Sequence, residues 1–149
     1  MSLLKLAGVL SAAVAVLHVL IIFVGAPAYR YFGAGERMAR LAEQGSATPT
    51  MITLGLTLVF GVWAAYAFSG AGLLRRLPLL GPALITIGLV YTLRGLLLGP
   101  QVVWFFSAQR AAVPRRQLAF SAAALLTGLA YLVGTHRAWA RLGNGRFGE

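Results

Sequence analysis

The chain has 149 residues, of which 59% are hydrophobic and 11% are charged, and its formal net charge is +10. A soluble domain carries about 25% charged residues, so this chain has too few charges to cover a water-exposed surface. The absence of cysteine excludes disulfide exchange, thiolate catalysis and cysteine-ligated metal sites.

Four apolar stretches approach the length of about 20 residues that an α-helix needs to cross a bilayer. They predict membrane-spanning helices at about 4–26, 50–69, 77–98 and 117–136. The first stretch exceeds the apolar region of a signal peptide, which is about 7–15 residues long, so it is interpreted as a retained helix. We therefore expect one domain, residues 1–149, with an all-α fold: an integral membrane four-helix bundle.

The segment at about 29–44 is too polar to span a membrane. Within it, Glu36 and Arg40 have the i,i+4 spacing, in the order that stabilises a helix. This pattern predicts a short interfacial helix between the first and second spans.

The end of the third predicted span leaves two alternatives open. Gly99-Pro100 either ends the helix or kinks a helix that continues, and the second alternative moves Arg94 from near a helix end to mid-helix. Gly95 and Gly99 also form a GxxxG pair, which allows close helix approach in lipid and is a candidate helix-packing motif.

The distribution of Lys and Arg is balanced between the two predicted membrane sides. The side of the termini carries Lys5, Arg75, Arg76, Arg137, Arg141 and Arg146, and the other side carries Arg30, Arg37, Arg40, Arg110, Arg115 and Arg116. The short loop with Arg75-Arg76 favours termini in the cytoplasm, and a bacterial cytoplasmic membrane is the expected location. The tie also permits dual topology and an antiparallel homodimer.

Ionisable side chains inside a membrane are costly, so each one in a predicted span is a candidate functional residue. Arg94 and His18 meet this criterion. Four-span topology brings further polar residues to the same half of the bundle, and the predicted ligand-binding set is Arg94, His18, Tyr91, Glu36, Arg37 and Tyr29. A cationic, aromatic-lined cleft of this kind suits a phosphate or carboxylate headgroup with an apolar tail.

Both membrane-level residues also have structural interpretations. Arg94 can extend its side chain to the interface, or pair with Glu36 or Glu43. His18 can donate a hydrogen bond to a backbone carbonyl or to a hydroxyl of a neighbouring helix.

Three functions remain open from these residues. The first is non-catalytic binding or movement of an amphiphilic or anionic ligand such as a lipid. The second is an accessory or scaffolding subunit of a membrane complex. The third is a membrane enzyme that acts on a hydrophobic substrate, with His18 transferring a proton and Glu36 orienting it.

Membrane lipids are the expected partners, and a homo-oligomer or a membrane protein partner is also permitted. No nucleic acid is expected, because the cations lie between apolar runs rather than on one basic face. No cofactor or metal is expected, because His18 and His136 lie at different membrane levels and the histidines and carboxylates form no ligand cluster.

Overall fold

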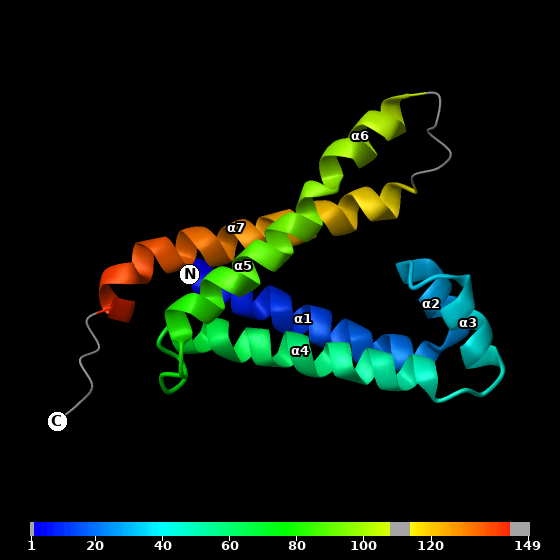
Figure 1. Cartoon of the computed structure of the whole chain (residues 1–149), viewed down its shortest axis with the longest axis horizontal. Helices are drawn as coiled ribbons and strands as arrows, with labels where there is room; N and C mark the ends of the chain where they lie inside the picture. The colour runs from blue at the N-terminus through cyan, green and yellow to red at the C-terminus, as the bar shows by residue number, and fades with distance from the viewer. Residues whose placement is uncertain (1, 108–113, 144–149) are drawn as a thin grey trace. The chain divides into compact units, whose positions relative to one another are not determined.

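The computed structural model describes residues 2–107 and 114–143, although not the side chains of 104–105 and 141–143. These residues form helices and no strands, which confirms the all-α prediction. The helices in Figure 1 are α1 (Leu3–Val24), α2 (Ala26–Phe32), α3 (Glu36–Glu43), α4 (Thr48–Gly70), α5 (Leu80–Leu96), α6 (Leu98–Phe106) and α7 (Arg115–Gly143). Arg110 and Arg146, which enter the count of cations on each membrane side, lie outside the described residues.

Four helical stretches in the described part of the chain are long and apolar enough to cross a membrane. They are Leu3–Val24, Thr48–Gly70, Leu80–Val103 and Arg115–Ala140. The third begins at Leu80 rather than 77 and ends at Val103 rather than 98, because the helix continues past Pro100. The fourth is longer at both ends than the predicted 117–136, and α7 begins directly after Pro114. Length and composition therefore suggest a membrane protein.

The chain divides into two compact units, which are described separately. The first comprises Met1–Gly8 and Ala65–Glu149 and is called the α5–α7 unit. The second comprises Val9–Ala64 and is called the α2–α3 unit.

Helices α5 and α7 pack against each other through glycines of α5 (Figure 1). Gly81, Gly88 and Gly95 occur at every seventh residue, so they lie on one face of the helix. They face Trp139, Leu132 and Leu125, which are also seven residues apart and run in the opposite direction. This antiparallel heptad register fixes which residues of the two helices lie at the same level.

Leu97 interrupts the helix between α5 and α6. Pro100 lies in the first turn of α6, where its missing N–H removes no helical hydrogen bond. The backbone N–H of Gln101 still donates to the carbonyl of Leu97 at 3.2 Å. The helical path therefore continues through the break, and Arg94 lies inside the candidate span Leu80–Val103 rather than at its end.

The polar segment at 29–44 forms two short helices instead of the single predicted helix. Gly33 and Gly35 adopt φ values of 81° and 97°, which L side chains rarely adopt, and these two residues separate α2 from α3. The N–H of Gly33 donates to the carbonyl of Tyr29, which satisfies the C-terminus of α2. The two helices pack together around the buried residues Ile21, Ala26, Ala28, Tyr29 and Ala39.

Candidate functional site

Arg94 is joined to two other polar side chains within the α5–α7 unit. Its Nη1 donates to the hydroxyl of Ser121 at 3.0 Å, and that hydroxyl donates to Oε1 of Gln101 at 2.8 Å. Ser121 is completely buried, whereas Arg94 is exposed. Among the described residues the guanidinium has this one partner, so its other N–H donors are available to a ligand.

The helix register shows the direction in which the Arg94 side chain extends. Since Gly95 faces Leu125, the position on α7 level with Arg94 is Leu126. Ser121 lies five residues nearer the start of α7, which is about 7.5 Å at 1.5 Å per residue. The Arg94 side chain therefore runs along α5 towards α6. Arginine takes this direction when it moves its charge from the membrane interior towards the interface.

The described part of the α5–α7 unit contains no acidic side chain. The acids of the chain are Glu36, Glu43 and Glu149, of which the first two belong to the α2–α3 unit and the third lies outside the described residues. The described cations of the unit are Lys5, Arg75, Arg76, Arg94, Arg115, Arg116 and Arg137. Arg94 therefore has no carboxylate counter-ion among the described residues of its own unit.

Tyr91 lies one turn before Arg94 and contributes to the packing between α5 and α7. It is 6% exposed, and its ring stacks on that of Tyr131 with centroids 5.8 Å apart and planes 16° from parallel. The structure thus places Tyr91 beside the Arg94 site as a packing residue.

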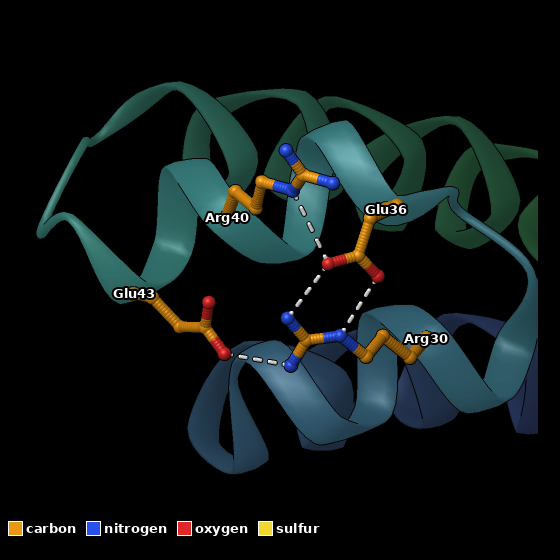
Figure 2. Close-up of polar contacts among 4 residues, drawn as sticks. All are labelled: Arg30, Glu36, Arg40 and Glu43. Carbon is orange, nitrogen blue, oxygen red and sulfur yellow. Dashed lines mark hydrogen bonds and ion pairs between the residues drawn. The ribbon is translucent and has the colours of Figure 1, made fainter.

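Arg30 organises the polar surface of the α2–α3 unit (Figure 2). Its guanidinium binds both oxygens of Glu36, at 2.9 Å each, and Oε1 of Glu43 at 2.6 Å. The predicted pair of Glu36 and Arg40 is confirmed, with Nε of the arginine donating at 3.3 Å. Both described carboxylates of the chain therefore bind arginines of their own unit.

These ion pairs shift the ionisation of the groups involved. Hydrogen bonds from Arg30 lower the pKa of Glu36 to about 2 and hold the pKa of Glu43 below its usual range. Hydrogen bonds to the same carboxylates raise the pKa of Arg30 above its ordinary value. All three groups are therefore charged near neutral pH.

Tyr29, a predicted ligand-binding residue, lies in the core of the α2–α3 unit. It is 3% exposed, and its hydroxyl is 3.2 Å from that of Thr53 in α4, which donates to the carbonyl of Pro49. The phenol hydroxyl accordingly joins α2 to α4 through a buried hydrogen bond.

His18 has the backbone contact that its structural interpretation predicts. Its Nδ1 donates to the carbonyl of Val14 at 2.8 Å, and its ring lies 5.0 Å from that of Phe60. Glu36 binds Arg30 and Arg40, and no contact between Glu36 and His18 occurs in the described part of the chain. The enzyme alternative, in which Glu36 orients His18, therefore has no geometric support within this unit.

Arg37 lies on the outer face of α3. With Glu36, Arg40, Leu41 and Gln44 it lines an open depression of about 410 Å³. Arg37 has no ion pair or hydrogen bond to the other described residues. Its guanidinium is thus free to bind a ligand from outside the chain.

The predicted glycine pair has two different environments. A Cβ at Gly95 would lie 2.5 Å from the backbone nitrogen of Leu125, whereas a Cβ at Gly99 would have no described atom within 4 Å. Gly95 therefore permits the close approach of α5 and α7. The glycines that share its packing face on α5 are Gly81 and Gly88, and Gly99 is not one of them.

The residues that position Arg94 were only partly recognisable in the sequence. Ser121 lies in a serine- and alanine-containing helix and is not part of the predicted set, because a lone serine carries no distinctive signal. Gln101 follows Arg94 by seven residues, and this heptad spacing is the signal that links them. For Arg30, the two nearby glutamates were the available signal.

Among the described residues, no group of three or more His, Asp or Glu side chains is arranged to hold a metal ion. Comparison of the chain with protein-family models, curated proteins and solved structures finds no match. The function is therefore inferred from the residues of this chain alone.

Proposed function

We propose that this protein spans a membrane with four helices and binds the anionic headgroup of a lipid, or of another amphiphile, through Arg94. The observation that carries the proposal is the guanidinium of Arg94 inside an apolar span, with one hydroxyl partner and no carboxylate in the described part of its unit. A charge at this level is costly unless it finds a counter-ion. A phosphate or carboxylate at the membrane surface supplies that counter-ion.

The surface of the candidate spans supports a lipid environment. Phe23 in α1, Leu58 in α4 and Leu93 in α5 are 82%, 71% and 65% exposed. Large exposed apolar areas are unfavourable in water and are favourable against lipid tails. Leu93 directly precedes Arg94, so the proposed site offers an anion-binding group next to an apolar surface, as an amphiphile requires.

In this proposal Ser121 and Gln101 position the guanidinium. The buried Ser121 hydroxyl accepts a hydrogen bond from Arg94 and donates one to Oε1 of Gln101, and these two bonds hold the Arg94 side chain in its extended direction. The remaining donors bind the headgroup oxygens. The proposed location is a bacterial cytoplasmic membrane with the termini in the cytoplasm.

Native mass spectrometry of the protein in mild detergent, with identification of any bound lipid, tests this function. We expect a stoichiometric, chemically uniform adduct that is lost in Arg94→Ala and weakened in Arg94→Lys, because lysine keeps the charge but lacks the planar fork. Arg75→Ala is the matched control, since Arg75 is an exposed arginine outside the candidate spans.

Retention of the adduct in Arg94→Ala would contradict the proposal. A ligand-free mass in a defined oligomer would also contradict it and would favour the accessory-subunit alternative. Circular dichroism of each variant verifies that the helices are intact.

A further inference from the structure

The outer face of α3 concentrates polar groups around one depression. Arg37, Arg40, Leu41 and Gln44 follow one another at helical spacing, and all four line it. The opposite side of α3 is anchored, because Ala39 is completely buried and Met38 and Ala42 pack against the core of the α2–α3 unit. These four residues therefore lie on the outer face of an anchored helix.

The ion pairs of this unit leave part of its positive charge uncompensated. Arg30 binds the carboxylates of both Glu36 and Glu43. Arg40 uses only its Nε, in a 3.3 Å contact with Glu36, so its two terminal nitrogens remain available. Arg37 has no carboxylate partner in the described part of the chain. Two guanidinium groups thus flank the depression with free donors.

The chemistry of these groups suits a phosphate. A planar guanidinium donates two parallel hydrogen bonds to phosphate oxygens, and arginines on successive helical turns can bind one phosphate together. The amide of Gln44 adds a neutral donor, and the partly buried Leu41 offers an apolar contact next to it. Glu36 also lines the depression, but its negative charge is directed to Arg30 and Arg40.

We propose that the depression on α3 is a second binding site, in which Arg37 and Arg40 bind a phosphate group. The expected source is the headgroup of an anionic phospholipid at the membrane surface, and that source rests on the membrane insertion proposed above. A soluble phosphate ester has the same chemistry and is distinguished by experiment. The site uses none of the residues that bind or position the ligand at Arg94.

The test is a titration of the full-length protein in detergent, monitored by the side-chain Nε–H signals of its arginines in NMR spectra. The probes are dihexanoylphosphatidylglycerol, dihexanoylphosphatidylcholine and glycerol 1-phosphate, each below its micelle concentration. All titrations use the Arg94→Ala background, so that binding at Arg94 does not contribute. This titration therefore tests the site on α3 alone, whereas native mass spectrometry of Arg94→Ala tests the site at Arg94.

We expect the phosphatidylglycerol probe to shift the Arg37 and Arg40 signals and to bind more tightly than the phosphatidylcholine probe, whose trimethylammonium group opposes the arginines. Arg37→Gln should weaken binding about tenfold, as expected for the loss of a hydrogen bond between charged groups. Arg37→Lys should have an intermediate effect, and Arg75→Gln should have none. Added salt should weaken binding because the site is exposed.

Each outcome has a defined meaning. Binding of phosphatidylglycerol without glycerol 1-phosphate supports a lipid headgroup, and similar binding of both supports a phosphate site that accepts a soluble ester. Within the Arg94→Ala background, equal affinity with and without Arg37→Gln or Arg40→Gln would overturn the proposal, as would no shift with either anionic probe. Arg37→Gln tests the site without unfolding it, because Arg37 contributes no ion pair to the described structure.

Discussion

Arg94 and Ser121 lie on facing helices, and a 3.0 Å hydrogen bond joins Nη1 of the arginine to the completely buried hydroxyl of the serine. The same hydroxyl donates to Gln101 at 2.8 Å, so one small side chain of α7 connects α5 to α6 on either side of the break at Leu97. Removing this hydroxyl affects both the packing of the helices and the position of the guanidinium.

Ser121→Ala should destabilise the protein by about 1 kcal/mol, because it leaves the partly buried amide oxygen of Gln101 and an N–H of Arg94 without their partner. It should also weaken retention of a lipid bound at Arg94 by about threefold to tenfold. Denaturant titration and native mass spectrometry measure the two effects. Thr127→Val is the control, since the Thr127 hydroxyl bonds only to the carbonyl of Ala123 within its own helix. Unchanged lipid retention in Ser121→Ala would show that this hydroxyl does not position Arg94 for binding.

Gly95→Ala and Gly99→Ala should have opposite outcomes. The new methyl group at Gly95 would clash with the backbone of Leu125, so it must push α5 and α7 apart, at a cost of about 1–3 kcal/mol. At Gly99 the methyl group meets open space and should leave the stability unchanged or raise it slightly. Unfolding titrations of the two variants in the same detergent make the comparison, and equal destabilisation would disprove the packing register described here.

Arg30→Gln should loosen the α2–α3 unit, because it removes the shared partner of Glu36 and Glu43 at once. We expect backbone amides of α3 to exchange with deuterium several-fold faster than in the parent protein. Arg37→Gln also removes one positive charge, from α3, but it breaks no ion pair. The backbone amides of α3 should therefore exchange as fast in this variant as in the parent protein. Equal protection of α3 in both variants would show that the ion pairs contribute nothing to its order.

The same unit should lose stability in acid. The pKa of Glu36 is lowered from 4.5 to about 2 by its hydrogen bonds to Arg30, so the contribution of this pair is complete above pH 4.5. It is lost as the pH falls from about 4.5 towards 2 and the folded state has to take up the proton. Hydrogen exchange of α3 between pH 6 and 2, corrected for intrinsic rates, measures the loss. Glu36→Gln should remove this carboxylate's share of the pH dependence, and the share that remains should belong to Glu43, whose pKa is also lowered.

Tyr29→Phe should reduce stability by about 1 kcal/mol, because it removes the buried hydrogen bond between the Tyr29 and Thr53 hydroxyls. Lipid retention should stay at the parent level, since Tyr29 is 3% exposed and belongs to the core. Thr53→Val is the reciprocal control, and the double variant should cost less than the sum of the single ones. Loss of a bound lipid in Tyr29→Phe would show that the Tyr29 hydroxyl contributes to ligand binding, as the sequence predicted.

The long helices could be predicted from the sequence alone. An apolar run of about 20 residues is recognisable without knowledge of its neighbours, because backbone hydrogen bonds within the helix satisfy every polar group of the chain. The pair of Glu36 and Arg40 was predictable for a similar reason, since i,i+4 neighbours meet on any helix. The break between α2 and α3 depends on the φ values of Gly33 and Gly35, which glycine permits but does not impose.

The contacts between side chains of different helices depend on the tertiary structure. The sequence offered Gly95 with Gly99, whereas the antiparallel register of α5 and α7 selects Gly95 with Gly88 and Gly81. It also gave no sign that Ser121 would be the partner of Arg94, and the presence of Glu36 and Glu43 near Arg30 did not show that one guanidinium would bind both. These contacts join residues far apart along the chain or across a turn, so they depend on helix register and backbone direction rather than on any local pattern.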